Sequence, residues 1–97
     1  MTMHNPPHPG EFITNVYLDP NGWSGRELAR KLGVAASTLS RILTGSSAIS
    51  PEMALRLSKS IGRSPESWLA MQYNYDLWHA RQNVDLRNVS KMRFNAA

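Results

Sequence analysis

The stretch from Gly25 to Thr44 reads GRELARKLGVAASTLSRILT, and its spacing predicts two short helices joined by a tight turn. Helices that cross at about 90–120° through a turn of three or four residues need a small residue at the crossing, and the turn needs a residue that tolerates positive φ. Ala29 and Gly33 meet these two needs. The stretch therefore predicts a helix-turn-helix unit, and the alternative is an ordinary helical hairpin. The positions expected to hold the two helices together are Leu28, Ala29, Leu32, Gly33, Val34, Leu39 and Ile42.

The second of these helices is expected to leave a slim, polar and basic face outward. Slim side chains suit a recognition helix, because the major groove of DNA is only about 12 Å wide. Arg41 can donate two hydrogen bonds to a guanine, and Arg26 stands near the start of the preceding helix, where it can reach a phosphate. The residues that we predict to contact DNA are Arg26, Ala36, Ser37, Thr38, Ser40, Arg41, Thr44, Ser46 and Ser47.

Positive charge is concentrated around this unit. The net charge is +4 and the sequence pI is about 10.0. Residues 24–63 hold seven Lys or Arg against two Glu, which gives 7 − 2 = +5, whereas residues 1–23 and 64–79 each hold two acidic residues and no basic one. Such a balance favours anionic partners. On charge alone, a solvated basic surface explains the pattern equally well.

Capping signals predict three further helices. The first begins near Pro9, turns Phe12, Ile13, Val16 and Tyr17 inward, and stops at the breaker cluster 19–22. The sequence Ser-Pro-Glu occurs at 50–52 and again at 64–66. Each copy is typical of a helix start. These last two helices are expected to end at Gly62 and near residue 81.

The expected architecture is all-α, with five helices in one domain. No segment alternates apolar and polar residues for long, so no strand is expected. The chain has 97 residues, which fits a single domain. We expect a flexible N-terminus at 1–8, the DNA-binding domain at 9–81 and a polar, basic tail at 82–97. The tail is expected to be frayed, and the alternatives are a short partner-binding segment and a strand completed in a dimer.

Several classes of function are excluded or disfavoured. The chain has no cysteine, so disulfides, thiolate zinc sites and cysteine nucleophiles are excluded. No apolar run is long enough to cross a bilayer and no signal peptide is evident, so a cytoplasmic protein without a membrane partner is expected. His4 and His8 are four residues apart, but the intervening prolines forbid the helix that would align them on a metal. No nucleophile motif or phosphate-binding loop occurs, and we expect neither enzyme activity nor a cofactor.

Five stretches resemble the Xre/Cro-like helix-turn-helix family, and most closely its HigA antitoxin branch. The most specific is Ser64-Pro-Glu-Ser-Trp-Leu69, with Gln72 and Tyr75-Asp-Leu-Trp78 after it. The other four are His8-Pro-Gly-Glu11, Glu27-Leu-Ala-Arg-Lys-Leu-Gly-Val34, Leu39-Ser-Arg-Ile-Leu-Thr-Gly45 and Ile49-Ser-Pro-Glu-Met-Ala-Leu-Arg-Leu57.

The resemblance implies a five-helix, lambda-repressor-like domain that binds a palindromic operator as a dimer. Members of this branch typically repress their own operon and neutralise a ribosome-dependent mRNA-cleaving toxin of the HigB type. Two residues depart from the family pattern. Ala35 opens the recognition helix at a position where a capping Ser is common. The absence of this cap lowers the stability of the helix by about 1 kcal/mol. Ala36 stands where many Cro-like repressors have Gln for an adenine contact, so that contact is not carried over.

Aromatic residues of the last helix are candidates for a dimer contact, because such residues are enriched at interfaces. They are Trp68, Tyr73, Tyr75 and Trp78. For Trp68 and Tyr75 the alternative is a place in the core. Two alternatives to an autorepressing antitoxin are also open: an inhibitor that mainly occludes a toxin through its acidic flanks, and a stand-alone regulator without a toxin. RNA binding is a weaker alternative, since no ladder of surface aromatics is evident.

Overall fold

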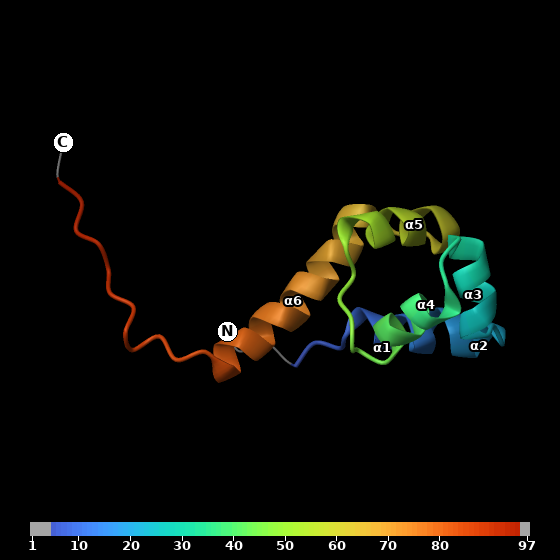
Figure 1. Cartoon of the computed structure of the whole chain (residues 1–97), viewed down its shortest axis with the longest axis horizontal. Coiled ribbons are helices and arrows are strands. Elements are labelled where there is room, and N and C mark those ends of the chain that lie inside the picture. The colour runs from blue at the N-terminus through green and yellow to red at the C-terminus, as the bar shows by residue number, and fades with distance from the viewer. Residues whose placement is uncertain (1–4, 96–97) are drawn as a thin grey trace.

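The computed structural model describes residues 5–95, and every regular element in this range is helical (Figure 1). Because the first three elements follow one another without a break, they form one helix, and this range holds five helices in all. The all-α architecture expected from the sequence is confirmed. The elements are α1 (Pro9–Ile13), the π-helical η1 (Thr14–Leu18), α2 (Asp19–Asn21), α3 (Gly25–Leu32), α4 (Ala36–Leu43), α5 (Pro51–Ile61) and α6 (Pro65–Asn83).

The two ends of the chain are described only in part. Residues 1–4 and 96–97 lie outside the described residues, and with them His4 and the outer parts of the two expected terminal segments. Among the helices of residues 5–95, none combines the length and the apolar character that a membrane span requires.

The helix at the N-terminus continues through Pro20, the second residue of the breaker cluster 19–22. The N–H of Asp19 donates to the carbonyl of Thr14, five residues back, so the turn before Pro20 is a wide π turn. Because proline has no N–H, a change of hydrogen-bond pattern at this point lets the helix continue. It ends at Gly22, at φ 65°. The helix therefore ends within the predicted breaker cluster 19–22, at its last residue and not at its first.

The wide turn also changes which residues face inward. Val16 was expected in the core but its side chain is 45% exposed, because the extra residue in the π turn shifts the helix face. Ile13 is fully buried, and Phe12 and Tyr17 pack against the core from its edge.

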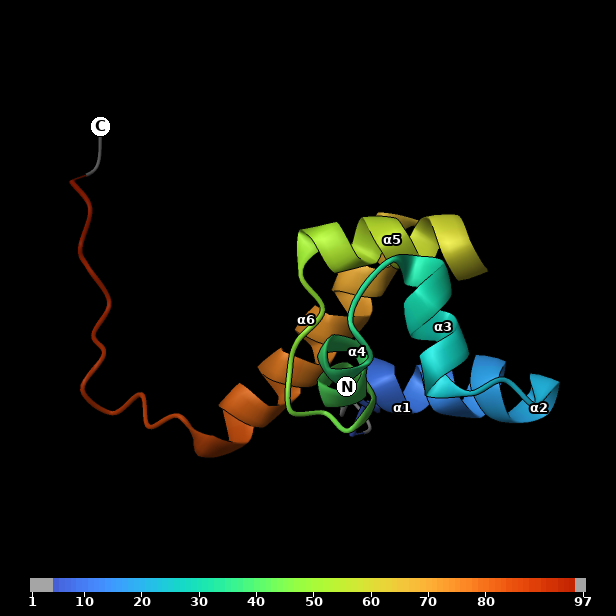
Figure 2. The ribbon, with the colours of Figure 1, turned by 45° about the vertical axis from the view of Figure 1, so that its right-hand side comes forward.

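One core lies among the five helices. In Figures 1 and 2, α5 crosses one side of the domain, α3 and the first half of α6 lie against it, and α1 and α4 lie opposite. Trp68 of α6 is completely buried, and its Nε1 donates to the carbonyl of Gly62 at 2.9 Å. The buried apolar residues are Ile13, Leu18, Leu28, Ala29, Leu32, Leu39, Ile42, Ile49, Met53, Ala54, Leu57 and Trp68.

The longest helix, α6, projects beyond the domain. Its first half packs on α5. Residues 84–95 continue from its far end as non-helical chain with one hydrogen-bonded turn at 86–89, and they lead away from the other helices (Figures 1 and 2). This gives the molecule extents of 57 × 27 × 25 Å. All residues from 81 to 95 are exposed.

Candidate nucleic-acid interface

The turn between α3 and α4 has the geometry that the sequence predicts. Gly33 has φ 74°, in the left-handed region that favours glycine. Its N–H donates to the carbonyl of Arg30 at 3.2 Å, and the N–H of Val34 donates to that of Ala29 at 3.0 Å. Ala29 is 2% exposed, so the crossing of the two helices leaves no room for a larger side chain. The turn thus fixes the direction in which α4 leaves α3.

The inner and outer faces of α4 differ as a recognition helix requires. Leu39 and Ile42 are buried on the inner face. Ala35 holds the N-cap position, and no side chain caps the helix there. On the outer face Ala36, Ser37, Ser40 and Arg41 are exposed, and Thr38 is half-buried at its edge.

Arg26 lies beside this outer face. A shallow hollow is shared between the first turn of α3 and the outer side of α4. Because Arg26 and the two serines of α4 line the same hollow, an anionic ligand that met one of them would meet the others. The residues that line it are Gly25, Arg26, Ala36, Ser37, Ser40 and Leu43.

The three remaining predicted contacts follow the end of α4. The carbonyl of Arg41 accepts hydrogen bonds from the N–H groups of Ser46 and Ser47, at 2.8 and 3.0 Å. The hydroxyls of Thr44 and Ser46 are 3.2 Å apart on the exposed surface. Ser47 is half-buried and faces His8, so it is less available than the other two.

Behind its C-terminal end, α4 rests directly on α1. A Cβ atom at Gly10 would overlap the carbonyl oxygen of Ile42 and lie 2.7 Å from the Cα of Leu43. Backbone of α4 therefore touches backbone of α1 at this crossing. Sequence reasoning used Gly10 only as part of a helix start. A glycine inside a helical turn, where it disfavours the helix, is the signal that could have found this crossing.

His8 caps α1 at the same place. Its Nδ1 accepts a hydrogen bond from the N–H of Gly10 at 2.9 Å, and its ring meets the edge of Tyr75 of α6 at 4.9 Å. Burial lowers the pKa of His8, and the charges of Asp76 and Glu11 and a hydrogen bond with the backbone of Ser47 only partly oppose this. A neutral imidazole is what the cap needs, because only an unprotonated Nδ1 can accept.

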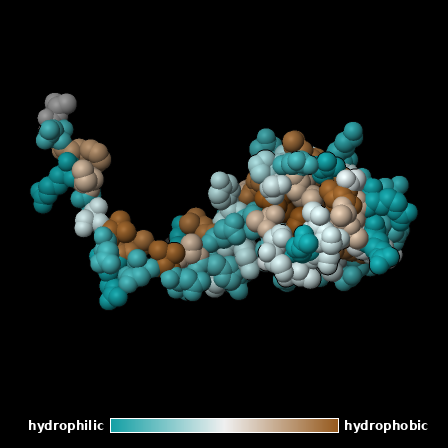
Figure 3. Space-filling view, viewed as in Figure 1, coloured by the Kyte–Doolittle hydropathy of each residue, from teal (hydrophilic) through white to brown (hydrophobic). Residues whose placement is uncertain are grey.

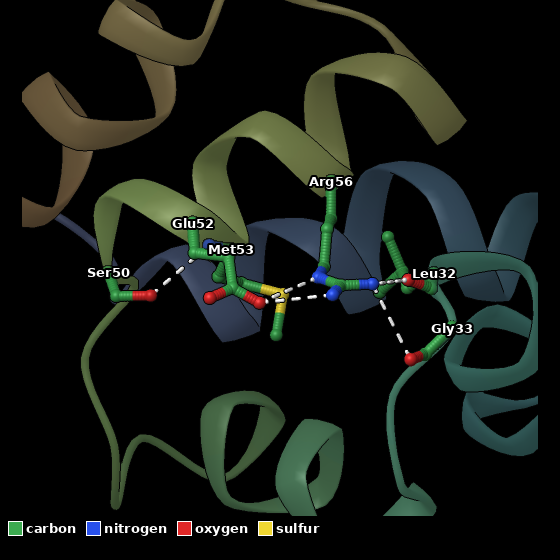
Figure 4. Close-up of polar contacts among 6 residues, drawn as sticks. All are labelled: Leu32, Gly33, Ser50, Glu52, Met53 and Arg56. Atoms are coloured by element: carbon green, nitrogen blue, oxygen red, sulfur yellow. Dashed lines mark hydrogen bonds and ion pairs between the residues drawn. The ribbon is translucent and has the colours of Figure 1, made fainter.

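Arg56 reaches from α5 to the turn that precedes α4 (Figure 4). Its Nη1 donates to the carbonyl of Leu32 at 2.8 Å and to that of Gly33 at 3.5 Å. Its Nε and Nη2 lie 3.1 and 3.0 Å from Oε2 of Glu52. Carbonyls at a helix C-terminus lack partners in the helix and carry negative partial charge, so a guanidinium stabilises them. From the sequence Arg56 looks like an ordinary exposed charge, because its carbonyl partners are 24 and 23 residues away.

Gln72 holds the loop that follows α4. Its side chain is buried, and its Oε1 accepts a hydrogen bond from the N–H of Ile49 at 2.9 Å. Its Nε2 donates to Oδ1 of Asp76 at 3.0 Å. The loop is thereby fixed to α6.

The four aromatic dimer candidates lie in different surroundings. Trp68 is completely buried, so it is a core residue and is not available for a contact with a second chain. Tyr75 is half-buried between His8 and His79. Trp78 is half-buried against the ring of His79, whereas Tyr73 is 73% exposed. Among residues 5–95, no three His, Asp or Glu side chains are grouped so that they could hold a metal ion.

The chain is similar to known helix-turn-helix proteins. A family model described as helix-turn-helix matches residues 17–68. The chain is 44% identical over 92 residues to the uncharacterized HTH-type transcriptional regulator YddM of Escherichia coli K12. This match covers 95% of this chain and 97% of that protein. It is 34% identical over 80 residues to antitoxin HigA-1 of Vibrio cholerae, and this match covers 82% of this chain and 75% of that protein. The solved structure of antitoxin GraA in complex with its operator matches with a TM-score of 0.83 and 38% identity, over 99% of this chain and 98% of the other.

Proposed function

The chain belongs to the helix-turn-helix family, in its Xre/Cro-like class and HigA antitoxin branch, and on this premise we propose that it binds operator DNA as a homodimer and represses its own operon. This family consists of DNA-binding regulators and antitoxins rather than enzymes, so we assign no catalytic residue. The proposal places the protein in the cytoplasm, where the operator is.

The observation that carries the proposal is the exposed, slim face of α4 beside Arg26. Arg41 donates to a guanine edge, and Ser37 and Ser40 bond base edges or phosphate. Ala36 offers an apolar contact to a thymine methyl, and Thr38 joins the contact if the helix rolls slightly in the groove. Arg26, Thr44, Ser46 and Ser47 meet the phosphate backbone, which fixes the register of the protein on the duplex.

A substitution series tests these roles. Purified variants are titrated, at several salt concentrations, with duplex DNA from upstream of the gene and with single-base variants of that DNA. Arg41→Ala should lose about 1–3 kcal/mol of discrimination at one base position. Arg26→Ala should weaken binding to all sequences alike and lower the salt slope by about 1. Lys59→Ala, on α5 outside the hollow, is the control. Unchanged binding in both arginine variants contradicts this mode of docking.

An antitoxin role is a second function, favoured by the antitoxin names of the relatives. We propose a small, basic toxin as the partner, since residues 1–23 and residues 64–79 each carry two acidic residues and no basic one, so that either stretch could meet it. Co-expression of the chain with the neighbouring small reading frame, followed by purification through a tag on this chain alone, tests it. Recovery of both chains at equal stoichiometry is expected, and recovery of this chain alone leaves a stand-alone regulator.

A further inference from the structure

The segment after α6 exposes more apolar surface than a polar tail should. Its five large apolar residues are between 56% and 86% exposed, a concentration that marks a contact surface. Figure 3 shows apolar atoms gathered where α6 passes into this segment. The five residues are Val84, Leu86, Val89, Met92 and Phe94.

A groove on the domain presents the matching surface. It has a volume of about 220 Å³ and lies between α6 and the loop that follows α4. Tyr73 forms part of its wall and is 73% exposed, and Leu77, one helical turn further along α6, is 47% exposed. Its lining residues are Ala48, Ile49, Pro51, Leu69, Gln72, Tyr73 and Asp76.

The segment and the groove are complementary in charge as well. Residues 84–95 hold Arg87, Lys91 and Arg93 against Asp85, which gives 3 − 1 = +2. Residues 64–79, which contain the α6 wall of the groove, hold two acidic residues and no basic one, which gives −2. The basic, apolar segment is therefore opposite in charge to residues 64–79, whose Asp76 lines the groove.

The direction of the chain separates the two surfaces within one molecule. Val84 ends α6 with φ −87° and ψ 128°, so the backbone leaves the helix extended. Residues 86–89 form a turn in which the N–H of Val89 donates to the carbonyl of Leu86 at 2.9 Å, and the chain beyond this turn does not come back to α6. The segment accordingly leads away from its own domain (Figure 1).

We propose that residues 84–95 are an arm that crosses to a second copy of this chain and lies in that copy's groove, beside Tyr73 and Leu77. Two-fold symmetry makes the exchange reciprocal, so that two arms occupy two grooves. The effect of this exchange on operator binding rests on the proposed function. The groove borders the loop that leaves α4, so the exchange joins the copies near their recognition helices and sets the spacing with which they meet the operator.

Cysteine pairing tests the exchange directly, because the natural chain has no cysteine. One tagged preparation carries Ala48→Cys in the groove, and differently tagged preparations carry Leu86→Cys, Val89→Cys or Met92→Cys in the arm. The two are mixed without DNA under mild oxidation. At least one arm position should form a disulfide with the groove of the other chain, whereas the same arm positions should not pair with Lys59→Cys on α5. A third preparation carries the groove cysteine and one arm cysteine in the same chain and is oxidised at high dilution. A disulfide that forms in this preparation, but not between the two single-cysteine chains, overturns the proposal.

A dissociation measurement gives the second readout. A chain truncated after Asn83 and the variant Tyr73→Ser should each raise the dimer dissociation constant in analytical ultracentrifugation about tenfold or more. Circular dichroism checks that both remain helical. Dimerisation as tight as that of the full chain contradicts the arm. Operator titration of the full chain is run beside these assays, so that failure of DNA binding with intact cross-linking counts against the proposed function alone.

Discussion

Substitution of Gly10 by alanine should move the recognition helix. A Cβ at this position would lie 2.7 Å from the Cα of Leu43, and ordinary contact begins at 3.4 Å, so these backbones must part by at least 3.4 − 2.7 = 0.7 Å. The overlap with the carbonyl oxygen of Ile42 requires still more. Neither atom belongs to a side chain that can rotate away. The adjustment therefore displaces α4 or α1 as a whole.

The energy of this displacement can be bounded. Alanine in place of glycine favours a helix by about 0.5–1 kcal/mol. Overpacking of a tight contact costs about 1–3 kcal/mol. The free energy of unfolding of Gly10→Ala should therefore fall by up to about 2.5 kcal/mol. Operator affinity should fall further, because a displaced Arg41 would lose the base contact that we propose for it, worth about 1–3 kcal/mol.

Two measurements on one preparation test this reasoning. Urea unfolding gives the stability, and operator titration, under conditions where the variant is fully folded, gives the loss that comes from misplacement. Gly25→Ala is the matched control for urea unfolding alone, since a Cβ there would meet only the side-chain tip Cδ1 of Leu43, at 3.2 Å, but Gly25 lines the hollow assigned to DNA. Gly10→Ala with natural stability and natural operator affinity refutes the idea that this crossing positions α4.

Three further variants probe the contacts around α4. Arg56→Gln should lower the free energy of unfolding by about 1 kcal/mol, because it weakens a charged hydrogen bond to the carbonyl of Leu32 at a partly exposed site. The control variant Lys59→Ala should leave urea unfolding unchanged. Gln72→Leu should cost about 1–3 kcal/mol in the same assay, since it leaves the buried N–H of Ile49 without a partner, and an unchanged midpoint contradicts this. Thermal stability should fall as the pH drops below about 6.5, because burial lowers the pKa of His8 and the unfolded chain then binds the proton more readily. His8→Asn, which keeps a cap acceptor, should flatten this pH dependence, and an equal slope in both proteins argues against His8.

The helix-turn-helix unit could be predicted from the sequence because its signals are local. Ser24 and Glu27 form the capping box that opens α3, with the two reciprocal hydrogen bonds at 3.1 and 3.0 Å. The Gly33 turn follows from the same few residues. These signals lie within one or two helical turns of the structure that they determine. Their outcome therefore does not depend on how the rest of the chain folds.

The contacts that hold this unit in place could not be predicted in the same way. Gly10 meets Ile42 across 32 positions, and Arg56 meets Leu32 across 24. At such separations the pairing follows from the packing of whole helices, which no local pattern encodes. The continuation of the first helix through Pro20 is a related case, because a π turn that supplies the altered hydrogen bonds has no local signature.

The recognition helix depends on its neighbours more than on itself. No side chain caps α4, no acidic residue lies in its first turn, and its outer face has no packing partner within the described residues. Its position is set by the turn that Arg56 holds, by the crossing at Gly10 and by the loop that Gln72 fixes. Substitutions at these positions should reduce operator affinity without changing the salt slope, because none of them removes a phosphate contact. Loss of Arg26 should change that slope, so salt dependence separates residues that touch DNA from residues that position the helix.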